Sequence, residues 1–276
     1  MSAPEGAPGP LSLNTATVRD QWNLAQAIEG CARHGIPGIS PWRDKVAALG
    51  LAQAARHIRD AGLFVSGLCR GGAFPAADAT GRRAAIDDNL RAIEEAHALG
   101  ARCLVVLGGG LPPGSKDLPG ARAMFHDGLA EVLPVARAAG VTLALEPLHP
   151  MTCADRSVLT TLAQALDLCD ALGDGLGIAL DVYHVWWDPM LTQQVARAGR
   201  RIAAFHVCDW LVPTTDLVFD RGMPGDGVID IPAIRAMAEA AGYAGCCELE
   251  LLSRRWWQED PDQVLLRAKA AHAAAC

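Results

Sequence analysis

Residues 142–147 read TLALEP, a short apolar run that ends in a glutamate, and this segment with three later ones decides the fold. The others are GIALDVYH (177–184), IAAFHVCDW (202–210) and CCELELLS (246–253). Each is typical of a buried strand and carries a metal-ligand type of residue toward its carboxyl end. These residues are Glu146, Asp181, His206 and Glu250, separated by 35, 25 and 44 positions. Residues so far apart cannot share one loop, so a common site requires converging strand ends, as in a parallel β-barrel.

The rest of the chain repeats the same unit. Glycines end the helix-like stretches at Gly35, Gly62, Gly100, Gly140, Gly173, Gly199 and Gly242. Their mean spacing is about 35 residues, which suits one strand and one helix. Strand-like runs follow at GISPW (38–42), LFVSGLC (63–69) and RCLVVLGGG (102–110), and LSLNTAT (11–17) precedes them all, which makes eight strands. Eight alternating units predict an α/β fold, a single-domain (β/α)8 TIM barrel over residues 11–276. The competing fold, an open doubly wound sheet, gives no reason for ligands at the ends of the last four strands.

Composition narrows the class of protein. The chain has 276 residues, 51% of them hydrophobic, and a formal net charge of −7. The negative charge argues against nucleic acid and against an anionic membrane as partners, because phosphate binding rests on clustered Lys and Arg. No apolar run reaches the length of about 18 residues that a membrane span needs. The sequence leaves a homo-oligomer open.

The N-terminus and the cysteines bear on localisation. Residues 1–10, MSAPEGAPGP, lack the basic start and apolar stretch of a signal peptide, so we expect a flexible lead-in there. The nine cysteines show no paired CxxC arrangement, and several lie within strand-like runs. We therefore expect buried, reduced thiols and a cytoplasmic protein.

Three of the four residues beneath the ligand-type residues have small side chains. Because side chains alternate along a strand, the residue two positions earlier faces the same side. That residue is Ala144 for Glu146, Ala179 for Asp181 and Ala204 for His206, whereas Glu248 lies below Glu250. Small side chains leave room for a site above them. Three carboxylates and one imidazole suit one divalent metal ion, Mn²⁺ or Mg²⁺ first, with Co²⁺ or Zn²⁺ as further options.

Four motifs resemble a known family. They are ALEPLHP (144–150), DVYH (181–184), FHVCDW (205–210) followed by RGMPGDGVIDI (221–231), and GYAGCCELELLS (242–253). With them the chain resembles the xylose-isomerase-like barrel family from about residue 11 to 270. This family takes in sugar phosphate isomerase/epimerase-type proteins, ketose 3-epimerases, inosose-processing enzymes and endonuclease IV.

The resemblance implies roles for individual residues. The four metal ligands of the family match Glu146, Asp181, His206 and Glu250. In the epimerases the first and last of these carboxylates also move the proton, which implies that Glu146 and Glu250 are catalytic. His184 matches a histidine that contacts substrate, and Arg221 matches an arginine near the substrate oxygens.

Departures from the family narrow the activity. Endonuclease-type members have histidines at the ends of strands three and four, where this chain reads LCRGG (68–72) and LVVLGGG (104–110). We therefore expect one metal ion and no DNA substrate. Ketose 3-epimerases carry a glutamate six residues after the first ligand, and this chain has Thr152 there. A simple free ketohexose bound in that manner is not expected.

Other residues have two interpretations each. Glu248 either orients the far imidazole nitrogen of His206, as carboxylates behind metal ligands do, or belongs to a buried structural ion pair. Trp42 and Arg70 end the second and third strands and are candidate substrate contacts. The glycines at 108–110 either let a phosphate approach the backbone or serve a tight turn.

The sequence thus predicts a metal-dependent isomerase or epimerase acting on a sugar, sugar phosphate or related keto-polyol. A divalent ion and an arginine would stabilise the enediolate that forms when a proton leaves the carbon beside a carbonyl. Two alternatives stay open: a dehydratase of an inosose-like keto-polyol, which uses the same intermediate, and a non-catalytic sugar-binding barrel.

Overall fold

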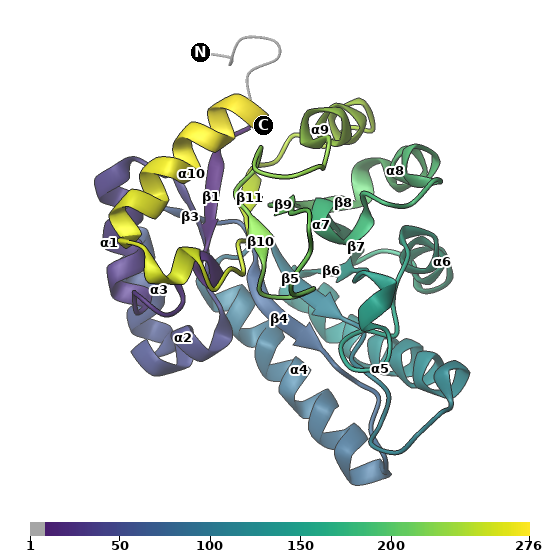
Figure 1. Cartoon of the computed structure of the whole chain (residues 1–276). Coiled ribbons are helices and arrows are strands. Elements are labelled where there is room, and N and C mark those ends of the chain that lie inside the picture. The colour runs from purple at the N-terminus through teal and green to yellow at the C-terminus, as the bar shows by residue number, and fades with distance from the viewer. Residues whose placement is uncertain (1–8) are drawn as a thin grey trace.

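The computed structural model describes residues 9–276, so the predicted lead-in lies outside it except for Gly9 and Pro10. Nine strand segments form one parallel sheet that curls into a nearly closed barrel with helices around it (Figure 1). The segments are β1 (Leu11–Asn14), β2 (Gly38–Ser40), β3 (Phe64–Val65), β4 (Leu68–Gly72), β5 (Cys103–Leu107), β6 (Thr142–Glu146), β7 (Leu176–Asp181), β8 (Ile202–Val207) and β11 (Cys247–Leu249).

The sheet closes through one interrupted strand. Its order is β3-β2-β1-β11-β8-β7-β6-β5-β4, and the two end members are consecutive pieces of the chain. They are the halves of the predicted strand at 63–69, broken at Ser66 and Gly67, and a parallel bridge from Trp42 to Cys69 continues the pairing. The eight predicted strands and the TIM barrel are therefore confirmed. An open doubly wound sheet is wrong, because its strand order would reverse part-way across.

Helices separate the strands along the chain. They are α1 (Leu24–His34), α2 (Arg43–Leu49), α3 (Leu51–Asp60), α4 (Ala79–Leu99), α5 (Leu118–Ala139), α6 (Leu162–Leu172), α7 (Val182–Val185), α8 (Leu191–Ala198), α9 (Ile231–Ala240) and α10 (Pro261–Ala275). A capping box between Asn23 and Gln26 begins α1. As predicted, Gly35, Gly100 and Gly140 follow α1, α4 and α5 in the left-handed conformation. Glycine adopts this conformation without the steric cost that a Cβ atom would add.

The sequence patterns did not predict one element. Strands β9 (Asp209–Trp210) and β10 (Arg221–Gly222) form a short antiparallel pair after β8, outside the barrel sheet. Short 3-10 turns, η1 (Thr15–Val18), η2 (Pro150–Thr152), η3 (Gly199–Arg201) and η4 (Trp256–Gln258), lie in the connections. The β9–β10 pair matters because it carries Arg221.

The buried residues form two groups. A large cluster fills the space between barrel and helices, and a small one lies inside the barrel. The inner cluster comprises Cys69, Cys103, Val105, Ala144, Ala179 and Ala204. Three of these are the alanines predicted beneath the ligand-type residues, so the inward direction of those strand positions is confirmed.

All nine cysteines are free thiols, and eight of them are buried, as expected. None of the helices within residues 9–276 combines the length and the apolar character that crossing a bilayer demands.

Candidate metal centre and active site

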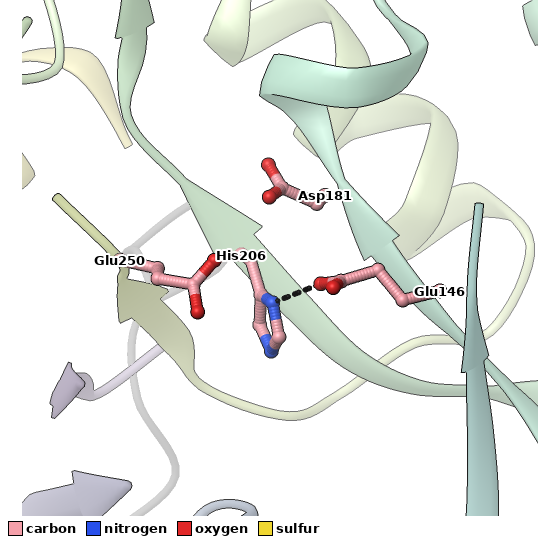
Figure 2. A group of neighbouring side chains, drawn as sticks. All are labelled: Glu146, Asp181, His206 and Glu250. Atoms are coloured by element: carbon pink, nitrogen blue, oxygen red, sulfur yellow. Dashed lines mark hydrogen bonds and ion pairs between the residues drawn. The ribbon is translucent and has the colours of Figure 1, made fainter. Parts of the chain in front are cut away.

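Four strands bring the predicted ligand residues to one place. Glu146 ends β6, Asp181 ends β7, His206 lies near the end of β8, and Glu250 directly follows β11. One ligand-type atom from each lies within 4.8 Å of the others, and all four residues are buried (Figure 2). The register explains this, since Asp181 pairs with His206 on the adjacent strand. Barrel closure therefore gathers residues that the sequence spaces up to 104 positions apart.

The electrostatics of this cluster favour a cation. Burial raises the pKa of Glu146, and burial raises the pKa of Asp181 to about 7, because a carboxylate loses its water there. Burial alone would lower the pKa of His206, but the neighbouring carboxylates of Glu248, Glu146 and Glu250 raise it well above its usual value. The site thus concentrates negative groups that lack solvent. A divalent ion would offset this charge, and the donor set matches the ligands that Mn²⁺ and Mg²⁺ accept.

His206 bridges two carboxylates with its two ring nitrogens. Nδ1 is hydrogen-bonded to Glu146 Oε1 at 2.8 Å, on the side of the ligand cluster. Nε2 lies 3.5 Å from Glu248 Oε1 and has no hydrogen-bond partner within residues 9–276. Glu248 thus faces the far nitrogen of His206 at ion-pair distance, a position that fits both the orienting role and the buried structural ion pair.

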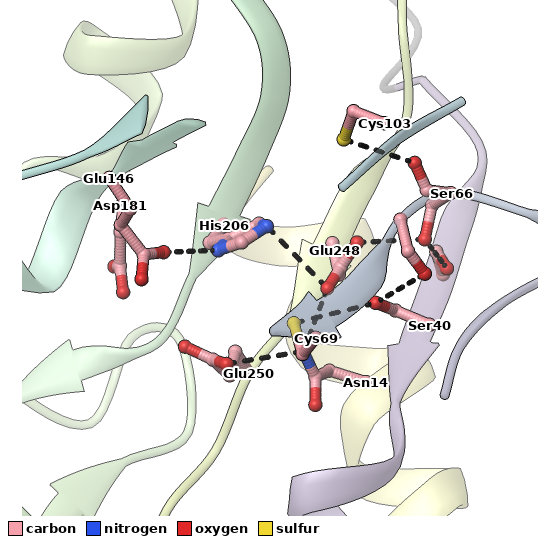
Figure 3. Close-up of polar contacts among 12 residues, drawn as sticks. Asn14, Ser40, Ser66, Cys69, Cys103, Glu146, Asp181, His206, Glu248 and Glu250 are labelled. Atoms are coloured by element: carbon pink, nitrogen blue, oxygen red, sulfur yellow. Dashed lines mark hydrogen bonds and ion pairs between the residues drawn. The ribbon is translucent and has the colours of Figure 1, made fainter. Parts of the chain in front are cut away.

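Two hydrogen bonds hold the carboxylate of Glu248 (Figure 3). Asn14 Nδ2 donates to its Oε1 at 2.8 Å, and Ser66 Oγ donates to its Oε2 at 2.7 Å. Asn14 Nδ2 also lies 3.2 Å from Glu250 Oε1, so one amide ties both glutamates together. Trp42 Nε1 in turn donates to Asn14 Oδ1 at 2.8 Å. Asn14 is a site residue that the sequence reasoning missed, although a polar residue ending the LSLN strand was a usable signal.

Arg221 lies above the cluster, at the start of β10. Its Nη1 is 3.5 Å from Asp181 Oδ2 and 3.4 Å from Glu250 Oε2, and its guanidinium carbon is 4.4 Å from the centroid of the Tyr183 ring. Only 2% of the residue is exposed. A buried guanidinium among carboxylates keeps its charge, so Arg221 supplies a permanent cation at the site.

One buried carboxylate fixes the segment that follows Arg221. Both oxygens of Asp209 accept backbone N–H groups, from Trp210 and Ile229 at one oxygen and from Gly225 and Gly227 at the other, at 2.9–3.0 Å. Asp209 is fully buried. This explains physically why the PGDG turn follows the arginine: its amides close around a fixed anion.

His184 enters the same space from α7. The backbone N–H of His149 donates to its Nδ1 at 3.1 Å, which leaves the ring proton on Nε2. Burial, and then the charge of Arg221, lowers the pKa of His184 well below its usual value, so the ring is neutral. His184 Nε2 lies 3.3 Å from Arg221 Nη2. Two hydrogen-bond donors therefore point into one space, where they suit adjacent substrate oxygens.

A pocket opens above the ligand cluster. Its lining includes Trp42, Arg70, Arg156, His184 and Arg221 together with Glu146 and Glu250. The pocket has room for about 20 Å³, enough for an ion or one water molecule. The structure thus places Trp42 and Arg70 at the site, as the sequence suggested. Arg156 is a second residue that the sequence reasoning missed.

A family model for the xylose isomerase-like TIM barrel matches residues 27–272. The chain belongs to this family. Among curated relatives, the inosose isomerase of Bacillus velezensis is 26% identical over 276 residues, which cover 94% of each chain.

Two solved structures share the fold of this chain. Protein SMc04130 from Sinorhizobium meliloti 1021 is 56% identical, with a TM-score of 0.95 over 96% of this chain and 98% of that one. The IolI protein with a bound zinc atom is 22% identical, with a TM-score of 0.81 over 96% of this chain and 97% of that one. The second match shows a shared fold.

In this xylose isomerase-like barrel, the support of Glu248 for His206 can be tested. We expect Glu248→Gln to weaken Mn²⁺ binding about tenfold to a hundredfold, because glutamine keeps the size of the side chain but removes the charge that faces Nε2. Isothermal titration calorimetry measures the dissociation constant of Mn²⁺. Glu29→Gln on the exposed face of α1 is the matched control. If both variants bound Mn²⁺ as the wild-type protein does, Glu248 would have only a packing role.

Proposed function

We propose that this chain is a divalent-metal-dependent isomerase or epimerase that acts on a sugar, sugar phosphate or related keto-polyol through an enediolate. The observation that carries the proposal is the arrangement of Glu146 and Glu250. They come from strands on opposite sides of β8, and Figure 2 shows them on either side of His206 within one buried ligand cluster. The Bacillus velezensis relative, an inosose isomerase, belongs to the same reaction class.

The residues divide the work by position. Glu146, Asp181, His206 and Glu250 would hold the ion, and Mn²⁺ suits a set of three carboxylates and one imidazole. When bound, the metal supplies a positive charge that polarises the carbonyl and its neighbouring hydroxyl. Glu146 and Glu250 flank the substrate carbon, so one removes its proton and the other returns a proton to the opposite face.

Hydrogen-bond donors complete the mechanism. Arg221 directs a fixed positive charge at the space above the ligands, where the enediolate oxygens would develop negative charge. The neutral His184 ring offers its Nε2–H to a second oxygen of the substrate. Return of the proton to the opposite face gives epimerisation, and return to the neighbouring carbon gives isomerisation.

Exchange of carbon-bound hydrogen tests the proposal. We expect the Mn²⁺-loaded protein to replace a C–H proton beside the carbonyl with deuterium in D₂O, detected by proton NMR. The substrates are an inosose, D-fructose, D-fructose 6-phosphate and 5-keto-D-gluconate. EDTA should stop the exchange, and added Mn²⁺ should restore it.

The outcomes of this experiment separate the alternatives. Metal-dependent exchange with any of the four compounds supports an enzyme that forms an enediolate. New ultraviolet absorbance from an unsaturated product would instead identify a dehydratase. A protein that binds Mn²⁺ but exchanges no proton in any of the four is a non-catalytic barrel, and the proposed activity is then wrong.

The net charge and the free cysteines indicate the partner and the compartment of the enzyme. A small carbohydrate is the proposed partner, and the net charge of −7 gives no support for nucleic acid or an anionic membrane. Nine unpaired cysteines suit a reducing compartment, so we place the enzyme in the cytoplasm.

A further inference from the structure

Two arginines at the mouth of the site lack the partners that guanidinium groups normally have. The side chains of Arg70 and Arg156 form no hydrogen bond and no ion pair with any residue in the part of the chain described, 9–276. Arg70 only faces the ring of Trp42, at 5.9 Å from its centroid. By contrast, Arg43 lines a wider cavity outside this pocket, and its guanidinium group is paired with Asp88 and Glu95. A guanidinium held without an anion next to a catalytic pocket is a candidate binding group.

Arg70 and Arg156 stand where the deep pocket meets a wider outer cavity. Both line the pocket that contains Glu146, Glu250, His184 and Arg221. Both also line the outer cavity, which has a volume of about 410 Å³. A substrate whose reacting carbon lies on the pocket floor would therefore extend past these two side chains into the outer cavity.

The segment that carries Arg156 is anchored by its backbone. Arg156 N donates to Thr152 O at 2.9 Å, and Val158 N donates to Gly109 O at 2.7 Å. Between them, the buried Ser157 Oγ accepts the N–H of Gly108 at 3.1 Å. Gly108 and Gly110 serve this packing, since a Cβ on Gly108 would lie 2.7 Å from Ser157 Oγ and one on Gly110 would lie 2.6 Å from the backbone carbon of Asp155. Arg156 is thus presented on a fixed loop, which limits the entropy lost when it binds a ligand.

The charges around the pocket leave a positive excess on the side of the outer cavity. Four arginines line the outer cavity, Arg19, Arg43, Arg70 and Arg156, against two carboxylates, Asp44 and Asp88. Burial, and then the charges of Arg221 and Arg70, lowers the pKa of Arg156, because the like charges repel its guanidinium group. An anionic ligand between them would relieve this repulsion.

From this geometry we infer that Arg70 and Arg156 form an anion subsite, so that the substrate is a keto-polyol bearing a carboxylate or a phosphate at the end remote from the reacting carbon. Guanidinium groups bind both anions through paired N–H donors. The inference rests on the proposed function, because it places the reacting end of the substrate at the ligand cluster. It also explains why two cations line a pocket whose catalytic groups already include Arg221.

Binding of three matched polyols to the Mn²⁺-loaded protein tests the subsite. The probes are D-glucitol, D-gluconate and D-glucitol 6-phosphate, and isothermal titration calorimetry measures the Kd of each. We expect at least one anion to bind about tenfold to a hundredfold tighter than D-glucitol, the range for hydrogen bonds to charged groups. The tighter of the two anions identifies carboxylate or phosphate as the recognised group.

Substitutions assign the preference to the arginines. The Kd of D-glucitol divided by the Kd of the preferred anion measures the anion preference. Arg156→Met and Arg70→Met should each reduce this ratio at least about fivefold. Arg59→Met, which removes the same charge from the exposed face of α3, should leave the ratio unchanged. If Arg156→Met did not fold, as judged by loss of its thermal transition, Arg70→Met decides, because Arg70 is exposed.

Three results would overturn the subsite. They are equal affinity for all three polyols, no binding of either anion, and an anion preference that survives both arginine substitutions, which would assign it to the metal ion. The binding assay involves no proton transfer, so its failure is distinct from failure of the exchange experiment. An anion preference without exchange would reject the proposed activity and keep the subsite.

Discussion

Replacing Glu146 or Glu250 with glutamine should reduce metal-dependent exchange of the substrate C–H proton by about 10³-fold or more. Each glutamate is both a proposed ligand and a proposed proton carrier, and general acid–base catalysis alone contributes roughly 10² to 10⁴. An amide cannot accept the proton from carbon. Proton NMR in D₂O with saturating Mn²⁺ measures the rate, and Glu94→Gln on the exposed face of α4 is the matched control.

A third substitution separates loss of metal from loss of the proton carrier. Asp181→Asn removes a proposed ligand but no proposed proton carrier, so a higher Mn²⁺ concentration should recover much of its exchange. The same concentration should not rescue Glu146→Gln or Glu250→Gln. Full exchange in either glutamine variant would contradict the catalytic assignment of that residue.

Removing Arg221 should produce the next largest effect. We expect Arg221→Ala to reduce exchange about 10²- to 10³-fold, the usual cost of deleting a donor that stabilises a developing oxyanion. The variant should still bind Mn²⁺, because Arg221 donates to the ligand carboxylates without being a ligand. Calorimetry and the exchange rate together measure the two effects.

The conservative change at the same position sharpens the test. Arg221→Lys keeps the charge but loses the planar guanidinium that lies within reach of both Asp181 and Glu250, so its exchange rate should lie between those of Arg221→Ala and the wild-type protein. Unchanged exchange in Arg221→Ala, or loss of Mn²⁺ binding, would show that Arg221 serves the structure of the site rather than the reaction.

Most of the fold could be predicted because its signals are local. A βα unit needs an apolar strand, a helix and a glycine at the helix end, and each lies within about 35 residues of the next. The ligand positions followed from the period of two along a strand, which put Ala144 beneath Glu146 and pointed both inward. The β9–β10 pair was missed, since two residues per strand are too short to show a period.

Contacts between distant residues were beyond such patterns. Asn14 and Glu248 are 234 positions apart, and they meet because β1 pairs with β11 where the barrel closes. In the sequence, Asn14 is simply a polar residue after three strand positions, and it also caps the following turn. Arg156 lies in a loop with no periodicity, and its place at the pocket depends on backbone bonds to Gly109 and Thr152.

The sequence by itself therefore determined which strands exist, which of their side chains face inward, and which four residues could bind a metal. Only the tertiary structure decided what surrounds them: the amide of Asn14 between two glutamates, Arg221 above the cluster, and two unpaired arginines at the mouth. The physical reason is the distance along the chain over which the interactions act. Strand and helix patterns arise from interactions over a few residues, whereas a buried polar site is assembled by closure of a barrel, which pairs β1 with β11.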